Sequence, residues 1–259
     1  MDKRFFNPTE KPNRLKDQFA SLGLFVWWLF MSYGTFKVFP SLNWNLGMTV
    51  IDLMFVIGVL QFGMHESERR LLLKTSYTSG YTWIVALMCT FVTVLMSVIL
   101  LAILFLIGWV TIATPEQTLI QESQSLWDNI WLYTFVGLGH PVFMAFLTHY
   151  LIQIQFLQKL PTWVTMLLIG LFYGFLYHAS VPILGLFYGV LGVVATFVFV
   201  WTGFNLRVVF LLYVLFHVIL VSPTYGAVPI LILGFCCLLY FIRLGQKMSK
   251  EHQEKDVSV

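Results

Sequence analysis

Long apolar stretches follow one another along almost the whole chain, separated by short polar segments. A helix needs about 20 mostly apolar residues to cross the hydrocarbon core of a bilayer. Eight stretches approach or exceed this length, and they cover residues 21–39, 46–64, 81–110, 129–157, 162–179, 182–201, 206–222 and 226–242. The sequence therefore predicts an all-α membrane protein with about eight transmembrane helices.

The composition agrees with a membrane protein. Apolar residues make up 59% of the 259 residues and charged residues only 10%, whereas a soluble domain has about 25% charged residues. The period-two alternation of a membrane-spanning β-barrel is missing from these stretches. The net charge of +3 is small, so we expect the lipid bilayer as a partner and no nucleic acid.

The distribution of Lys and Arg predicts the orientation, because cytoplasmic loops carry an excess of both residues. If the N-terminus is cytoplasmic, all of the 15 Lys and Arg residues except Lys37 lie on the cytoplasmic side. Both termini are therefore expected in the cytoplasm, in a multi-pass protein of the cell membrane. No small-residue cleavage site follows the first apolar run, so we interpret that run as an anchor and not as a signal peptide.

The same pattern divides the chain into four parts. Residues 1–20 form a basic cytoplasmic leader, and residues 21–128 hold three membrane helices and an acidic outer loop. Residues 129–242 form a core of five membrane helices, and residues 243–259 form a cytoplasmic tail.

Ionisable residues inside apolar runs are candidates for function, because a charge at membrane depth is costly. The runs contain Asp52, His140, His149, His178 and His217. Asp52 is the only carboxylate well inside a span. It is either an ion or proton site, a structural partner for a buried histidine, or a carboxylate that reaches water or caps a neighbour.

His140 and His149 lie on the same expected helix. A separation of nine residues puts them on nearly opposite faces at 3.6 residues per turn. They face one cavity only if Pro141 distorts the helix, since an interior proline removes a backbone hydrogen bond. His149 has a simpler interpretation as a hydrogen-bonded packing residue.

His178 and His217 lie near the ends of two spans that both run outward in this topology. The rise per residue of a helix places the two imidazoles at depths within about 10 Å of each other. Together with His140 they are the candidate metal ligands, because three histidines can bind zinc and leave a fourth position open. The alternative is that each histidine makes a separate hydrogen bond between helices. No cofactor other than zinc is expected.

Four aromatic-rich pieces follow at regular spacing between Gly139 and Val221: GHPVFMAFLTHYL, LLIGLFYGFLYH, GLFYGVLGVVATFVF and TGFNLRVVFLLYVLFH. In the spacing of these pieces and in its eight expected spans, the chain resembles the CPBP family, the membrane proteins that include CAAX proteases and bacteriocin-processing proteins. That family shows Glu-Glu-x-x-x-Arg, then Phe-x-x-x-His, then His-x-x-x-Asn/Asp on successive membrane helices. The resemblance covers about a third of the chain and implies that residues 129–242 form a CPBP-like core.

Only two of the polar family positions are matched. His178 and His217 stand at the histidines of the second and third motifs. The other positions hold different residues: His140 and Pro141 for the glutamates, Ala145 for the arginine, Gly174 for the phenylalanine and Val221 for the Asn or Asp. In the family a glutamate is thought to activate a water, and the histidines assist. The resemblance therefore implies a degenerate member that lacks the usual base.

Three functional hypotheses follow. The first is a pseudoenzyme of Gram-positive bacteria that binds a peptide or a membrane or cell-wall protein without cleaving it, in bacteriocin self-immunity or regulation. The second is an active intramembrane endopeptidase built on His140, His178 and His217, with zinc or Asp52. The third is a small transporter or channel whose polar pathway contains Asp52 and the histidines. Asp52, His149 and Asn205 are the candidate binding residues.

Overall fold

A computed structural model describes residues 43–64, 79–106, 133–157, 159–178, 182–221 and 227–257, with further residues between 19 and 34 and at 69, 72, 73 and 130. The regular structure in these ranges is helical, without strands, as the apolar pattern predicts. Four described segments are long and apolar enough to cross a membrane: Trp44–Phe62, Gly80–Ile103, Phe135–Ile154 and Val228–Gln246. The prediction of a helical membrane protein is confirmed at this level.

The helices follow the predicted apolar runs closely. Helix α2 (Trp44–Gly58) continues as the π-helical segment η2 (Val59–Gly63), and α4 covers Ser79–Leu106. The fourth run consists of η3 (Phe135–Gly139), α7 (His140–Phe146) and η4 (Leu147–Ile154), of which η3 and η4 are π-helical. The remaining helices are α8 (Thr162–His178), α9 (Pro182–Trp201), α10 (Leu206–Val221) and α11 (Ala227–Val257). In the first run, residues 22, 23, 25–31 and 34 are helical.

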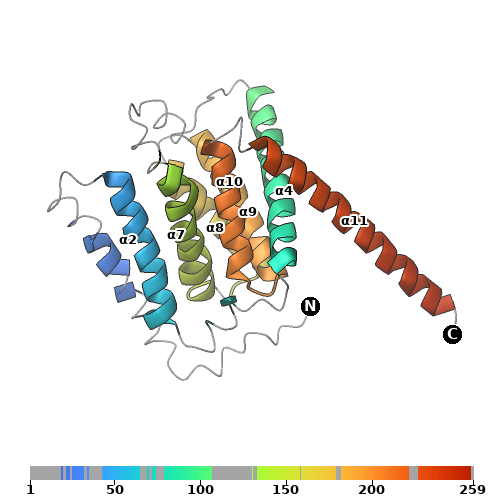
Figure 1. Cartoon of the computed structure of the whole chain (residues 1–259), viewed down its shortest axis with the longest axis horizontal. Helices are drawn as coiled ribbons and strands as arrows, with labels where there is room; N and C mark the ends of the chain where they lie inside the picture. The colour runs from blue at the N-terminus through green and yellow to red at the C-terminus, as the bar shows by residue number, and fades with distance from the viewer. Residues whose placement is uncertain are drawn as a thin grey trace.

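Helix α11 extends well past the predicted end of its apolar run at residue 242. It continues through the polar tail to Val257, where Gln, Lys, Met and Glu are all good helix formers. Figure 1 shows α11 starting beside α4 and leaning away from the other helices toward the C-terminus. The polar tail is therefore a continuation of a membrane helix.

Helix α10 lies at the centre of the bundle (Figure 1). It packs against α4, α7, α9 and α11, while α2 packs against α7 and η3. Side chains from α2, α4, η4 and α10 form one large apolar core. This arrangement places the fourth run between α2 on one side and α10 on the other.

Glycines allow α8 and α9 to approach each other very closely. A Cβ atom at Gly174 would collide with the carbonyl oxygen of Gly185, and one at Gly170 would lie 2.6 Å from Val193 Cγ2. Gly170 and Gly174 are four residues apart, which puts both on one helix face. Small residues at this spacing are typical of helix pairs in membranes, where close van der Waals contact drives association.

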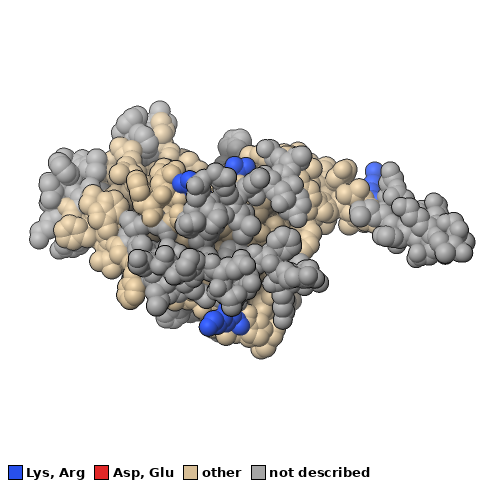
Figure 2. Space-filling view, turned by 90° about the horizontal axis from the view of Figure 1, so that it is seen from below, with Lys and Arg blue, Asp and Glu red and all other residues tan. Residues whose placement is uncertain are grey.

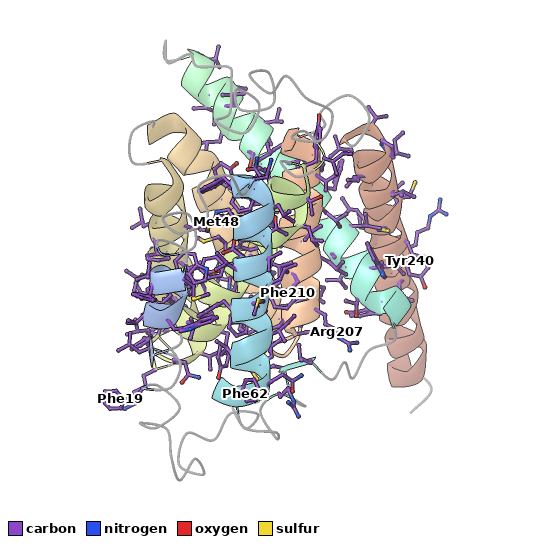
Figure 3. The ribbon with its side chains drawn as sticks, turned by 60° about the vertical axis from the view of Figure 1, so that its left-hand side comes forward. Phe19, Met48, Phe62, Arg207, Phe210 and Tyr240 are labelled. Carbon is purple, nitrogen blue, oxygen red and sulfur yellow. The ribbon has the colours of Figure 1, made fainter. Side chains whose placement is uncertain are left out.

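The outer surface of the bundle is apolar. Many large side chains are exposed, including Met54, Phe62, Leu171, Ile232 and Tyr240, and Figure 3 shows Phe62 and Tyr240 pointing outward. On the face in Figure 2, the described Lys and Arg side chains form separate patches among described residues that are otherwise uncharged. So many exposed apolar side chains are costly in water and favourable in lipid.

Candidate functional site

Asp52 is a fully buried carboxylate on α2 that contacts two other parts of the chain. Trp28 Nε1–H donates a hydrogen bond of 2.9 Å to Asp52 Oδ1. On the other side, His140 Nδ1 lies 3.5 Å from Asp52 Oδ2. Because an unpaired buried charge is costly, these two contacts stabilise the carboxylate inside the bundle. They also join the N-terminal helical residues 25–31, α2 and α7.

His140 is positioned by a change in the helical hydrogen-bond pattern. Its backbone N–H bonds to the carbonyl oxygen of Phe135, five residues back, which is π-helical spacing. The following residue, Pro141, has no N–H to donate and would leave a gap in a regular α-helix. Single π-helical turns absorb such gaps and re-aim side chains. The side chain of His140 is 27% exposed.

Aromatic rings fix the indole that holds Asp52. Trp28 stacks on Phe143 with ring centres 4.5 Å apart and on Phe25 at 5.6 Å. Phe55 meets Trp28 edge-on at 6.3 Å and Phe143 edge-on at 5.4 Å. Such pairs each stabilise by about 0.5–1.5 kcal/mol beyond their burial, so the Trp28–Asp52 bond rests on a rigid support.

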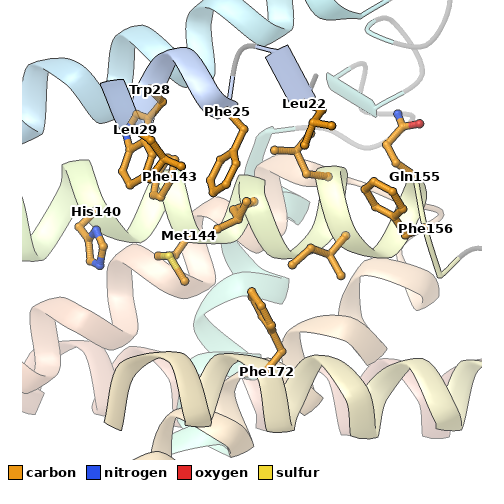
Figure 4. A pocket seen from close by; sticks show the side chains of 13 residues that line it. Leu22, Phe25, Trp28, Leu29, His140, Phe143, Met144, Gln155, Phe156 and Phe172 are labelled. Carbon is orange, nitrogen blue, oxygen red and sulfur yellow. The ribbon is translucent and has the colours of Figure 1, made fainter. Parts of the chain in front are cut away.

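A cavity of about 680 Å³ adjoins this aromatic cluster. Figure 4 shows its lining side chains on three segments: the N-terminal helical residues, the fourth run and α8. The N-terminal segment contributes Leu22, Phe25, Trp28 and Leu29, and α8 contributes Phe172. The longest wall is the fourth run, from His140 through Met144 and Leu151 to Phe156.

Polar side chains occur only at the two ends of the described cavity wall. His140 and Gln155 lie at opposite ends in Figure 4, and between them the lining is apolar or aromatic. From His140 to Phe156 the wall is at most roughly 24 Å long by the α-helical rise, because η4 is π-helical and rises less per residue. The cavity is therefore long and apolar, with His140 at one end and Asp52 behind it.

A second group of polar residues lies on the opposite side of the fourth run, facing α10. His149 is fully buried. Its Nδ1–H donates to Gln153 Oε1 at 2.8 Å, and its Nε2 accepts from the Tyr213 hydroxyl at 3.1 Å. Thr148 Oγ1 lies 3.3 Å from the same hydroxyl. Both ring nitrogens of His149 therefore have partners within the protein.

His217 extends this group along α10 and is only 1% exposed. Its Nδ1–H donates to the Tyr213 carbonyl oxygen at 2.8 Å. In the neutral ring Nε2 is then the acceptor, and it lies 3.4 Å from the Tyr173 hydroxyl on α8. We call Thr148, His149, Gln153, Tyr173, Tyr213 and His217 the buried polar seam. It joins η4, α10 and α8.

The structure thus separates the predicted site residues. Asp52 and His140 come together at the cavity, whereas His149 and His217 lie in the buried polar seam and are not part of the cavity wall. His178 ends α8, and its side chain lies outside the described residues. Among the residues that are described, no three His, Cys, Asp or Glu side chains are grouped to hold a metal ion.

Asn205 has a local role at the start of α10. Its Oδ1 accepts from the Arg207 N–H at 3.1 Å, as expected for an N-cap residue. The preceding residues Gly203 and Phe204 have φ of 70° and 67°, which turns the chain sharply between α9 and α10. Asn205 therefore terminates a turn, and it is not among the residues that line the cavity.

Sequence reasoning missed the residues that hold the predicted ones in place. Trp28, Phe143 and Tyr213 each contact an ionisable side chain, yet none carries a charge. A signal for two of them was available, since Trp and Tyr inside an apolar run need a partner for the N–H or O–H. A further signal was the spacing of His149 and Gln153, four residues apart, which allows a hydrogen bond between the two side chains.

Comparison with known proteins adds no identification. No protein-family model, no curated protein and no solved structure matches this chain.

Proposed function

We propose that this chain is a CPBP-like membrane protein that binds an elongated apolar ligand in its cavity and does not cleave it. The observation that carries the proposal is the long apolar cavity, with His140 at one end and the buried Asp52 behind it. Ligand sites typically combine a mostly apolar lining with a few polar groups that fix orientation. The cavity has this composition.

The state of the histidines supports binding over catalysis. A general base must reach the proton that it removes, within about 3 Å or through one water. Both ring nitrogens of His217 have partners inside the protein, and so do both ring nitrogens of His149. Neither histidine is available to a substrate in the cavity without a rearrangement of the buried polar seam.

The proposal includes eight spans and two cytoplasmic termini in the cell membrane. Phe62 at the end of the second run and Arg207 at the start of the seventh lie toward the same end of the bundle, with Met48 nearer the other end (Figure 3). The alternation of eight spans requires this relation. Arg207 also belongs to the basic residues that the predicted topology puts on the cytoplasmic side.

The resemblance suggests the biological setting of such a binding protein. CPBP members act in bacteriocin self-immunity and in peptide maturation in Gram-positive bacteria. A member without the glutamate pair fits an immunity, scaffold or regulatory role toward a peptide or a membrane or cell-wall protein. In that setting, the cavity is the place where the apolar part of a ligand is held.

A paired assay tests binding and cleavage on the same preparation. The full chain in lipid nanodiscs is mixed with a quenched fluorescent peptide that contains an apolar stretch, and separately with a fluorescent alkyl-chain probe. We expect no increase in peptide fluorescence, together with saturable binding of the alkyl probe. Leu147→Trp, which fills the middle of the cavity, should abolish probe binding. Ile232→Trp is the matched control, because Ile232 lies on α11 and is 58% exposed.

A second candidate is the active endopeptidase, which the Asp52–His140 contact favours. A carboxylate that orients an imidazole beside a cavity is the arrangement by which enzymes make a general base. Under this hypothesis the peptide is cleaved, and His140→Ala abolishes cleavage while the alkyl probe still binds. Cleavage that depends on His140 would overturn the non-catalytic proposal.

A further inference from the structure

We propose that the cavity takes one unbranched hydrocarbon chain of a lipid whose head is an alcohol or an amine, with the head held at the Asp52–His140 pair. This inference rests on the proposed binding function and names the class of ligand. It is supported by the size of the cavity, the chemistry of its wall, the charge and the aromatic rings at its polar end, and the apolar rim.

The size of the cavity favours a thin occupant over a helical peptide. A helix with its side chains is about 10–12 Å wide, so about 20 Å of it displaces about 1,600 Å³ or more. All the empty space of the cavity, its open side included, is about 1,430 Å³. A single extended chain fits this volume, and a chain lying along the wall would reach most of the way across a hydrocarbon core about 30 Å thick.

The wall chemistry separates a hydrocarbon chain from an extended peptide. Every residue of an extended peptide carries an N–H and a C=O, and each needs a partner when it leaves water. Between His140 and Gln155 the described wall consists of apolar and aromatic side chains such as Phe143, Met144 and Leu151. A peptide in this position would leave its backbone groups unsatisfied at several kcal/mol each. A hydrocarbon chain has no such groups.

The charge at the polar end selects the head group. Asp52 is the acidic group behind His140, and no Lys or Arg is found among the described lining residues. An anionic head such as a carboxylate would meet a like charge in a low-dielectric site, which is unfavourable. An alcohol or ammonium head donates hydrogen bonds to the imidazole, and an ammonium is also attracted to the carboxylate.

The surrounding rings favour a cation further. Phe143 and Trp28 line the cavity beside His140 and stack on each other. Aromatic faces attract a nearby cation. The polar end therefore presents aromatic rings, with the Asp52 carboxylate behind His140.

Access from the membrane completes the arrangement. Leu22, Leu29 and Phe156 line the cavity and are 52%, 48% and 62% exposed. These rim residues are apolar, so the opening suits a ligand that already lies in lipid and enters sideways. A water-soluble ligand would have to cross this apolar rim.

The test compares three ligands with the same straight chain and different heads. Hexadecylamine, hexadecanol and palmitic acid compete with the fluorescent alkyl probe on the full chain in nanodiscs of uncharged lipid. We expect the amine and the alcohol to bind about tenfold more tightly than the fatty acid, a difference that corresponds to roughly 1.4 kcal/mol. His140→Leu should remove this preference and leave chain binding intact. Leu29→Trp at the rim should weaken all three ligands, and Ile232→Trp should change none.

Each result decides the inference. Equal affinities for the three heads, tighter binding of the fatty acid, or a head preference that survives His140→Leu would overturn it. The proposed binding function fails separately, if Leu147→Trp leaves probe binding unchanged or if peptide is cleaved. If Leu147→Trp weakens probe binding but the three head groups bind equally, the proposed binding function stands and the inference about the head group is rejected.

Discussion

Two polar regions of the bundle use the same residue type in opposite ways. In the buried polar seam, His149 and His217 are almost completely buried and each ring nitrogen has a partner within 3.4 Å. At the cavity, His140 is 27% exposed and lies 3.5 Å from Asp52. The histidines of the seam are therefore buried and hydrogen-bonded within the protein, whereas His140 lines the cavity.

The difference separates a histidine that joins helices from one that lines a cavity. A fully satisfied polar group between helices stabilises the bundle and specifies how the helices pack. A partly exposed polar group that lines an apolar cavity is positioned to contact the polar end of a ligand. We therefore expect substitutions in the seam to reduce stability and substitutions at the cavity pair to change ligand preference.

The largest loss of stability is expected for His149→Ala. The change removes two hydrogen bonds, leaves Gln153 and the Tyr213 hydroxyl without this partner, and opens a cavity in the core. Together these effects should lower the free energy of unfolding by about 2–4 kcal/mol. Unfolding in mixed micelles measures the loss, and the folded fraction should still bind the alkyl probe. His140→Ala is the comparison variant: Asp52 keeps its bond from Trp28 and the lost side chain is 27% exposed, so the cost should be smaller than for His149→Ala. The reverse order would contradict the comparison.

The next largest effect is expected for Asp52→Leu, which removes the acceptor of Trp28 and the partner of His140. Leaving these groups unsatisfied should cost about 1–3 kcal/mol. Asp52→Asn is the sharper variant, because its amide oxygen still accepts from Trp28 while the negative charge is lost. We expect Asp52→Asn to keep most of the stability and to lose the preference for hexadecylamine over palmitic acid. Competition binding and unfolding on the same variants measure both quantities; an unchanged preference would argue against Asp52 as the charge that selects the head.

A smaller effect is expected for Tyr213→Phe. The hydroxyl joins α10 to His149 on η4, and hydrogen bonds between membrane helices contribute about 0.6 kcal/mol on average and up to about 1.7 kcal/mol. The variant should lose stability within this range. A double-mutant cycle with His149→Phe should give a coupling energy of at least about 0.5 kcal/mol. Additive losses would mean that the two side chains do not act together.

The sequence predicted the helices well, for a physical reason. Length and apolar content decide whether a segment is stable in lipid, and both are read directly from the chain. The limits of α9 and α10 fall within a residue of the predicted runs 182–201 and 206–222. The continuation of α11 through the polar tail was missed. The apolar run ends at residue 242, but the polar residues that follow still favour a helix.

The pairing of side chains was much harder to predict. Asp52 and His140 lie on different runs, and one sequence does not reveal which helix faces meet. The spacing of His140 and His149 correctly indicated different faces, and they contact α2 and α10 respectively. The π-helical segments η3 and η4 were not foreseen, since a π-helix and an α-helix have the same apolar composition. The interpretation of His149 as a hydrogen-bonded packing residue agrees with the seam.

The smallest effect is expected for Thr148→Val, and it sharpens what makes the seam important. The Thr148 hydroxyl donates to the Met144 carbonyl oxygen of its own helical run at 2.7 Å, and that oxygen also accepts from the Leu147 N–H. Valine has nearly the same shape, so removing the hydroxyl should cost less than about 0.5 kcal/mol. If Thr148→Val destabilised the protein as much as Tyr213→Phe, the contact of 3.3 Å between Thr148 and Tyr213 would supply most of the seam's contribution to stability. The stability of the seam would then not come mainly from the histidine bonds between helices.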